Sequence, residues 1–255
     1  MIERFVIPES KLFHKLVLYK LNNVIPIIDY AVENSKQTQA FETNFKRMLE
    51  TYPNNVFALK LSGLNLDESA TNRLIEEARV HDSKILIDAE NVNIQHKIEA
   101  ITNRIISHSK NKHVFKTYQM YRNDSYTTLA NDIETYNTNL NVKLVRGAYM
   151  HTDRFSGRLY TNKSDTDNAY NDAIALLLQN QHRIGQVIFA THNKQSFELI
   201  KHTTNDNFYH ASLMGFDDNF HSCNIQRMVY VPFGPPYQTY PYLIRRFLEN
   251  PIAFV

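Results

Sequence analysis

The sequence predicts an α/β protein that folds as a single-domain (β/α)8 barrel of the TIM type over residues 1–255. Short apolar runs alternate with longer amphipathic segments along the chain, which is the pattern of repeated βα units and a parallel sheet. This unit recurs eight times, the number that closes such a barrel. An open, doubly wound nucleotide-binding sheet would normally carry a G-x-G-x-x-G turn, and the chain has none.

Eight runs of seven or eight residues are predicted strands because they are rich in Val, Ile, Phe or Tyr. They cover 24–31, 56–62, 84–91, 114–121, 141–148, 186–193, 208–214 and 228–234. Amphipathic helices are predicted over 67–81, 167–181 and 238–250. Asp67 is a suitable N-cap for the first of these helices. The apolar face of that helix is predicted to hold Ala70, Leu74, Ala78 and Val80.

The composition is that of an ordinary globular protein, with 43% hydrophobic and 21% charged residues among 255. The net charge of +2 is too small to predict a nucleic-acid partner. A single cysteine, Cys223, excludes an internal disulfide and a cysteine-based zinc site, so a reducing compartment is expected. No apolar run reaches the ~18 residues of a membrane helix, and the N-terminus lacks signal- and transit-peptide features. We expect a soluble, cytoplasmic protein, with attachment to a membrane surface left open.

Polar side chains gather where the predicted strands end. In a (β/α)8 enzyme the loops after the strands converge on one mouth, so these side chains are candidates for a common site. Buried polar groups are costly unless they are paired or face a ligand, and their recurrence at seven strand ends predicts a concave polar site. They are Asp29, Glu33, Lys60, Asp88, Glu90, Gln119, Lys143, Arg146, Thr191, His192, Asn193 and Tyr230. Taken singly, Lys60 in a salt bridge and His192 as a core histidine remain open readings.

The segment NVKLVRGAYM, residues 141–150, combines a buried-strand pattern with two cations and a glycine. Lys143 and Val145 are two residues apart and therefore share a face of the strand, which directs one cation toward the barrel mouth. Gly147 lets the backbone approach a ligand closely. The alternative is that Lys143 pairs with Asp88 or Glu90 across adjacent strands, and both readings can hold together.

Two adjacent arginines, Arg245 and Arg246, lie on the last predicted helix, with Tyr242 one turn earlier. Paired guanidinium groups suit a carboxylate or a phosphate. A solvated helix face is the ordinary alternative for such a pair.

Five motifs resemble the catalytic domain of the proline dehydrogenase family: DAE, TYQMY, KLVRGAY, ATHN and YVPFGP followed by PYLIRRFLEN. The resemblance extends from about Arg4 to Asn250. It implies a (β/α)8 flavoenzyme that oxidises L-proline to 1-pyrroline-5-carboxylate, with hydride transfer from proline C5 to N5 of FAD. It also implies a quinone electron acceptor and a separate pyrroline-5-carboxylate dehydrogenase for the next step.

The resemblance also implies residue roles for the substrate. The substrate carboxylate would be bound by Lys60, Arg245 and Arg246. The pyrrolidine ring would be enclosed by Leu213, Tyr230 and Tyr242, and Tyr230 is the residue expected for proline rather than hydroxyproline. Glu33 would pair with Arg245 as a gate. Asp88 would lie near the flavin and interact with Lys60.

Further implied roles concern the cofactor. Gln119 and Lys143 would hydrogen-bond the isoalloxazine, and Lys143 would favour negative charge on the reduced ring. Ala89, Val145, Gly147 and Ala148 would run beside the cofactor, with Tyr149 at the site wall. Thr161, Lys163 and Thr166 would contact the pyrophosphate and adenosine at a helix start. Thr191, His192 and Asn193 would also line the FAD, and Glu249 its adenosine end.

The chain departs from the family pattern at Met150, where an aromatic residue is frequent, at Asp153, where Glu is usual, and in the loose match of HASLMGF. Two alternatives to proline oxidation follow. One is a flavoenzyme for another cyclic imino acid such as hydroxyproline. The other is a catalytically silent barrel that binds a small carboxylate.

Overall fold

The computed structural model describes residues 2–32, 37–107, 112–216, 223–235, 239 and 242–244. Within these ranges the eight strands pair in chain order as a closed barrel. The predicted fold class is thereby confirmed. A single domain over residues 1–255 stays a prediction.

Each predicted strand is present and ends one to four residues sooner than predicted. The strands are β1 (Val24–Tyr30), β2 (Val56–Leu59), β3 (Lys84–Ile87), β4 (Val114–Gln119), β5 (Asn141–Val145), β6 (Val187–Ala190), β7 (Phe208–Leu213) and β8 (Gln226–Phe233). The α-helices are α1 (Leu12–Leu21), α2 (Thr38–Thr51), α3 (Glu68–Val80), α4 (Val92–Ser107), α5 (Ser125–Tyr136), α6 (Met150–Asp153), α7 (Lys163–Gln179) and α8 (Lys194–Ile200). The 3-10 helices are η1 (Ile2–Arg4), η2 (Glu9–Lys11), η3 (Leu61–Leu64) and η4 (Asn137–Asn139).

The chain divides into two compact units. Unit 1 comprises residues 1–85, 211–221 and 227–255, and it contains β1, β2 and nearly all of β8. Unit 2 comprises residues 86–210 and 222–226, and it contains β4, β5 and β6. Strands β3 and β7 are divided between the two units.

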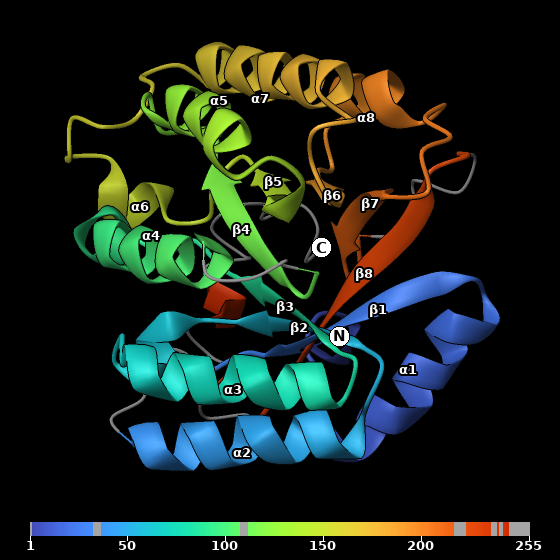
Figure 1. The fold of residues 1–255 in the computed structure, drawn as a ribbon. Coiled ribbons are helices and arrows are strands. Elements are labelled where there is room, and N and C mark those ends of the chain that lie inside the picture. Colours follow the sequence, from blue (N-terminus) through green and yellow to red (C-terminus); the bar gives the residue numbers. More distant parts are fainter. Residues whose placement is uncertain are drawn as a thin grey trace. The chain divides into compact units, whose positions relative to one another are not determined.

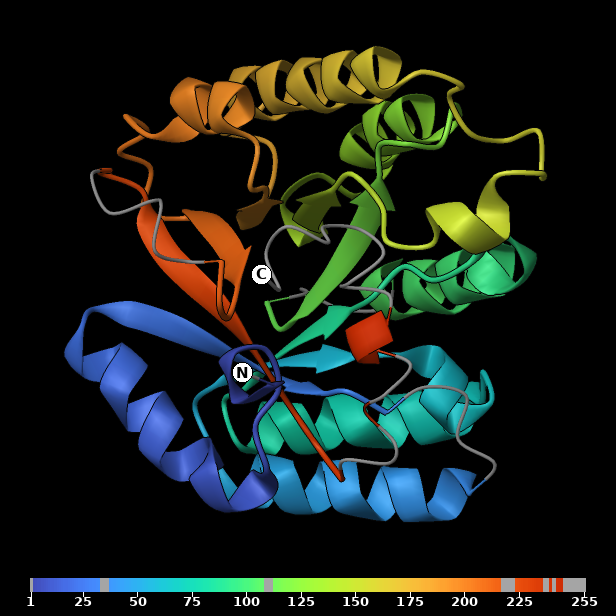
Figure 2. The ribbon, with the colours of Figure 1, turned by 180° about the vertical axis from the view of Figure 1, so that it is seen from behind.

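Unit 1 is built around aromatic packing. Strand β1 pairs in parallel with both β2 and β8, α1 lies against β1, and α2 and α3 lie side by side (Figures 1 and 2). Phe41 and Phe45 of α2 stack at 6.0 Å between ring centroids, and Phe45 meets Phe57 of β2 at 5.9 Å. All three rings are buried. Each contributes about 1.5–3 kcal/mol through the apolar surface removed from water.

Helix α3 confirms the predicted cap and corrects part of the predicted face. The Asp67 carboxylate accepts a hydrogen bond from the Ala70 amide at 3.0 Å, which satisfies one of the free amides of the first turn. Leu74 and Ala78 are buried as predicted, but Val80 is 73% exposed. Val80 lies about 200° around the helix from Ala78, and this rotation turns it away from the core.

Unit 2 places helices on one side of its strands. Strands β4 and β5 pair in parallel, as do β5 and β6, and α7 lies beside both α5 and α8 (Figures 1 and 2). Helix α7 begins at Lys163, before the predicted start at residue 167. The predicted helix 238–250 falls mostly outside the described residues. Among the described residues, every helix falls short of the length and apolarity that a bilayer-crossing segment requires.

The turns that precede β1, β2 and β3 each contain a residue in the left-handed backbone conformation. Asn23, Asn54 and Asp82 lie one or two residues before these strands, with φ values of 56°, 56° and 49°. Their short polar side chains tolerate this left-handed conformation better than other non-glycine residues do. Each turn therefore reverses the chain directly after the preceding helix.

Candidate functional site

A buried ion pair lies at the strand ends of unit 1. Lys60 follows β2, and its Nζ lies 2.6 Å from Oδ1 of Asp29 near the end of β1. The two side chains are only 6% and 3% exposed, respectively. Asp29 is in register with Ala58, two residues before Lys60, and the extended backbone at Lys60 continues the alternation of side chains. The salt-bridge reading of Lys60 is therefore confirmed.

The same face of unit 1 carries Tyr230. Strands β1 and β8 pair Ile27 with Tyr230, which places the tyrosine on the face that holds Asp29. The amide of Met214, directly after Leu213, donates to the Tyr230 carbonyl at 3.0 Å. Unit 1 therefore brings two of the predicted ring-enclosing residues onto neighbouring strands.

Tyr242, the third predicted ring-enclosing residue, is buried with Val6 and Ala31. Four further predicted site residues lie outside the described part of the chain. They are Glu33, Arg245, Arg246 and Glu249.

Unit 2 contains a second cation–carboxylate pair. Nζ of Lys143 on β5 lies 2.6 Å from Oδ1 of Asp88, directly after β3. The side chains are 7% and 13% exposed. Pairing of Lys143 with Asp88 was one predicted alternative and is confirmed, but the two strands are not adjacent. Strand β4 lies between them, so the Lys143 side chain reaches across β4.

The faces of β4 explain this reach. Nζ of Lys116 on β4 donates hydrogen bonds to Asn103 of α4 and Asp132 of α5. The face of β4 that carries Lys116 is therefore the face that the helices cover. Thr117, on the opposite face, is in register with Lys143. Lys143 therefore extends from the face of the sheet that turns away from α4 and α5. Lys143 and Val145 share this face, as predicted.

Gln119 also belongs to that face, since it is in register with Val145. Its amide nitrogen donates to the Glu90 carbonyl at 2.9 Å, and its side chain is buried. Ala89 is buried beside Asp88, whereas Val145 and Ala148 are partly exposed. These predicted cofactor residues therefore lie together at the carboxyl ends of β3, β4 and β5.

Gly147 allows a close approach, but its neighbour in the described structure is a side chain. Its φ is +138°, which disfavours any other residue, and a Cβ there would overlap the ring of Tyr121. The Tyr121 hydroxyl donates to Asp153 Oδ2 at 2.6 Å. Burial and this hydrogen bond raise the pKa of Tyr121 well above its usual value. The predicted approach of a ligand to Gly147 stays a prediction.

Asp153 has a structural role that the sequence did not reveal. Its second oxygen accepts a hydrogen bond from the Val92 amide at 3.1 Å, at the start of α4. Tyr149, the predicted wall residue, is buried, and its carbonyl accepts the Asp153 amide at 2.9 Å. Asp153 therefore ties α4 and Tyr121 to the segment after KLVRGAY.

The start of α7 carries the residues predicted for the pyrophosphate. Thr161 and Lys163 are exposed, and Thr166 is buried. Asn162 is the N-cap, but its side chain makes no capping hydrogen bond. Lys163 pairs with Asp167 one turn later. This exposed helix start therefore presents amide groups and a cation, which is the arrangement that binds phosphates.

The turn after β6 contains Thr191, His192 and Asn193. Asn193 caps α8 by accepting the Ser196 amide at 3.1 Å. The Thr191 hydroxyl accepts the Asn193 amide at 3.1 Å, and the Thr191 carbonyl lies 2.9 Å from Nε2 of His210. His192 is exposed, so its reading as a core histidine is wrong. Thr191 and Asn193 are thus held by specific hydrogen bonds.

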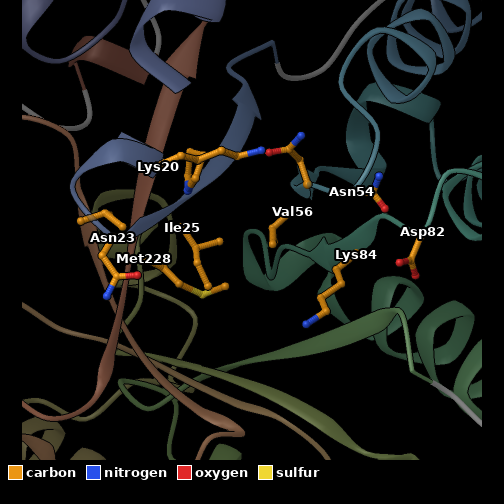
Figure 3. A pocket seen from close by; sticks show the side chains of 11 residues that line it. Lys20, Asn23, Ile25, Asn54, Val56, Asp82, Lys84 and Met228 are labelled. Carbon is orange, nitrogen blue, oxygen red and sulfur yellow. The ribbon is translucent and has the colours of Figure 1, made fainter. Parts of the chain in front are cut away.

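A pocket of about 360 Å³ opens at the amino-terminal ends of strands in unit 1 (Figure 3). Lys20, from the last turn of α1, and Lys84, at the start of β3, reach it from different elements. Burial lowers the pKa of Lys84, and the charge of Asp82 opposes this shift. None of the predicted site residues lines this pocket. Among the described residues, no cluster of His, Cys, Asp or Glu side chains could hold a metal ion.

Comparison with known proteins identifies the family. The sequence profile of the proline dehydrogenase family matches residues 19–253. The chain belongs to this family. The recognised motifs and the matched region therefore coincide over nearly the whole sequence.

Among curated proline dehydrogenase relatives, the mitochondrial proline dehydrogenase 1 of Dictyostelium discoideum is 38% identical over 197 residues, covering 65% of this chain and 34% of that protein. The carbapenem antibiotics biosynthesis protein CarD of Pectobacterium carotovorum subsp. carotovorum is 27% identical, with 89% of this chain and 72% of that protein covered. The chain thus spans about a third of the length of the Dictyostelium enzyme.

Solved structures show the same fold. Proline utilization A from Bdellovibrio bacteriovorus matches 97% of this chain and 32% of its own, with a TM-score of 0.84 and 17% identity. Proline utilization A from Corynebacterium freiburgense matches 98% of this chain and 31% of its own, with a TM-score of 0.83 and 16% identity. At these identities the match supports the (β/α)8 fold and leaves the residue roles to be argued from this chain.

Proposed function

We propose that this proline dehydrogenase family member oxidises L-proline to 1-pyrroline-5-carboxylate with FAD as cofactor. The observation that carries the proposal is the buried Lys143–Asp88 pair, which forms within the family motifs KLVRGAY and DAE. A cation held at a fixed place by a carboxylate suits a site where negative charge develops during reaction.

We assign substrate binding to residues of unit 1. Arg245, Arg246 and Lys60 would bind the proline carboxylate, because guanidinium and ammonium groups form strong charge-assisted hydrogen bonds. Leu213, Tyr230 and Tyr242 would enclose the pyrrolidine ring, whose CH₂ groups need an apolar wall. Glu33 would close over the substrate by pairing with Arg245. The buried Lys60–Asp29 pair supports this assignment, since it holds the Lys60 ammonium in one position.

Apart from Glu249, which belongs to unit 1, the residues that we assign to the cofactor belong to unit 2, and they fit a flavin dinucleotide. The α7 start, with Thr161, Lys163 and Thr166, offers helix amides and a cation to two phosphate groups. Glu249 would meet the adenosine. The remaining predicted contacts are Asp88, Ala89, Gln119, Lys143, Val145, Gly147, Ala148, Thr191, His192 and Asn193.

The chemistry can be divided between cofactor and protein. Bound FAD would accept at N5 the hydride that leaves C5 of proline, and loss of the amine proton would complete the C=N bond of the product. Lys143 would stabilise negative charge on the reduced ring, and Asp88 would hold Lys143 in place. Electrons would leave to a quinone-type acceptor, and a separate pyrroline-5-carboxylate dehydrogenase would consume the product.

The deciding test is the visible absorption spectrum of the purified protein, reconstituted with FAD and recorded before and after anaerobic L-proline. A flavin spectrum that bleaches is expected. A bound flavin that stays oxidised would refute proline as substrate. A protein that takes up no FAD would refute the flavin chemistry and favour a silent barrel.

Hydroxyproline is the second candidate substrate. The hydroxyproline dehydrogenase of Xenopus laevis is 27% identical over 207 residues. Tyr230 argues for proline, because the family resemblance associates this residue with proline and a smaller residue with hydroxyproline. We expect Tyr230→Ser to shift the ratio of kcat/KM toward hydroxyproline, while Tyr209→Ser on β7 leaves this ratio unchanged. An unchanged ratio in Tyr230→Ser would remove Tyr230 from the substrate site.

A further inference from the structure

Arg146, directly after β5, donates side-chain hydrogen bonds to three different residues. Its Nε lies 2.6 Å from Asp167 Oδ1, its Nη1 2.8 Å from the Thr191 hydroxyl and its Nη2 2.7 Å from the Ser196 hydroxyl. The guanidinium carbon also lies 4.3 Å from the centroid of the Tyr170 ring. Every nitrogen of the guanidinium group therefore has an acceptor, on three different elements.

These acceptors belong to two segments that we assign to FAD, namely the α7 start, which we assign to its phosphates, and the turn after β6. Asp167 is in the first turns of α7, where its carboxylate also forms a salt bridge with Lys163. Thr191 and Ser196 flank Asn193 at the start of α8, and the Ser196 hydroxyl lies 2.6 Å from Asn171 Oδ1 of α7. Arg146 thus joins the α7 start to the turn after β6.

The contacts of Asp167 stabilise its ionised form. Burial of the carboxylate opposes its ionisation, but hydrogen bonds from Lys163 and Arg146 outweigh burial, and the pKa of Asp167 lies below its usual value. Tyr170, under the guanidinium plane, is fully buried, which fixes the platform on which the group rests. A planar fork with three fixed acceptors and a ring beneath it has little freedom to move.

We propose that Arg146 is a positioning residue for the phosphate and adenosine end of FAD. It sets the position of the α7 start relative to the Thr191–Asn193 turn, without touching the cofactor itself. Arg146 would fix the position of Asp167, and Asp167 in turn would fix the position of Lys163. Lys163 would thereby point toward the phosphates. This proposal rests on the proposed function, since it assumes that the chain binds FAD.

If Arg146 had only a structural role, its loss should have the same effect as the loss of another buried arginine. Arg122 is such a residue. Arg122 is 5% exposed in the same unit, and among the described residues its Nε and Nη2 donate to the nearby Asp124, at 3.0 and 2.8 Å. Loss of Arg122 removes a buried guanidinium group without separating α7 from α8. Arg122→Met is therefore the matched control for Arg146→Met.

The test measures dissociation constants of FAD and FMN by fluorescence quenching on the cofactor-free protein. We expect Arg146→Met to raise the FAD constant by about ten- to a hundredfold, as loss of an outer supporting contact does at other sites. The FMN constant, which reports the isoalloxazine end, should change by less than about threefold on the same grounds. Arg146→Lys should fall between wild type and Arg146→Met, because a single ammonium group cannot serve three acceptors.

Hydrogen exchange of the cofactor-free protein gives a second readout. Amides of residues 163–170 and 191–197 should exchange faster in Arg146→Met, whereas those of β4 and all of Arg122→Met should exchange as in the wild type.

Equal losses of FAD and FMN affinity, or unchanged FAD affinity, would overturn the positioning role and leave the proposed function standing. Wild-type protein that binds no FAD would overturn both.

Discussion

The two units each bury a lysine–aspartate pair at 2.6 Å, but they assemble it differently. In unit 1, Lys60 meets Asp29 across the adjacent strands β1 and β2. In unit 2, Lys143 meets Asp88 past the intervening strand β4. A pair on adjacent strands follows directly from register, whereas a pair that skips a strand exists only on the inner side of a curved sheet.

The surroundings differ as well. The carboxylate of the unit 1 pair is 3% exposed, and it shares its face of the sheet with Ile27 and Tyr230. The pair of unit 2 lies beside polar networks, and its carboxylate is 13% exposed. The pair of unit 1 is therefore the more deeply buried of the two, and we expect the loss of its cation to cost more stability.

The largest expected effect tests this contrast in stability. Lys60→Met leaves the Asp29 carboxylate buried without its cation and should cost about 3–5 kcal/mol in free energy of unfolding. Lys143→Met should cost less, because Asp88 keeps some contact with water. Urea unfolding measures both. Adding Asp29→Leu to Lys60→Met should recover part of the loss. Equal costs at the two lysines would mean that the two pairs are equivalent.

The next effect separates the units by function. Arg245→Met or Arg246→Met should raise the KM for proline by roughly 10- to 100-fold, the value of a lost charge-assisted hydrogen bond. Both arginines lie outside the described residues. Because unit 1 is assigned to the substrate, FAD content should stay at the wild-type level. Steady-state kinetics and the flavin-to-protein absorbance ratio provide the measurements. Loss of FAD together with the KM change would contradict the division of roles.

A smaller effect concerns the flavin in unit 2. Lys143→Met should lower the reduction potential by about 30 mV, since the cation stabilises the anionic reduced ring. Asp88→Asn should move the potential in the opposite direction, because it removes the compensating negative charge. Spectroelectrochemical titration distinguishes the two variants. Shifts of the same sign would show that the pair acts through local structure rather than charge.

The smallest effect is a pH dependence. Asp167 has a lowered pKa in the folded protein, so its contribution to stability is present above its unfolded pKa and is lost as pH falls through the folded value. The variant Asp167→Asn should lack this acid loss, with a difference under about 1 kcal/mol. Urea midpoints between pH 7 and pH 3 test it. Identical pH slopes for both proteins would remove Asp167 as a source of acid sensitivity.

The strands and their order were predictable because each run is apolar enough to be buried on both faces. The N-cap at Asp67 was predictable as well, since its pattern is local. The partner of Lys143 was only partly predictable. The sequence indicated Asp88 as a partner, but on an adjacent strand. Contacts that skip a strand depend on barrel curvature, which no local pattern encodes.

Contacts of side chains across distant elements were the least predictable. Nothing in the spacing of Arg146, Asp167 and Ser196 indicates that one guanidinium group joins them. Gly147 was singled out for a ligand, but the described neighbour is the ring of Tyr121. In both cases the residue type was informative, and the partner depended on how segments distant in the sequence pack together.

Gly147, Tyr121, Asp153 and Val92 form one line of contacts from the end of β5 to the first turn of α4. A methyl group at Gly147 must displace the tyrosine ring, and the ring carries its hydrogen bond to Asp153 with it. A library of single substitutions would thus record residue 147 as intolerant both because of its own backbone conformation and because of Tyr121, which follows β4. Changes at these positions would be accepted together or not at all, so this part of the chain has few routes along which it can evolve one residue at a time.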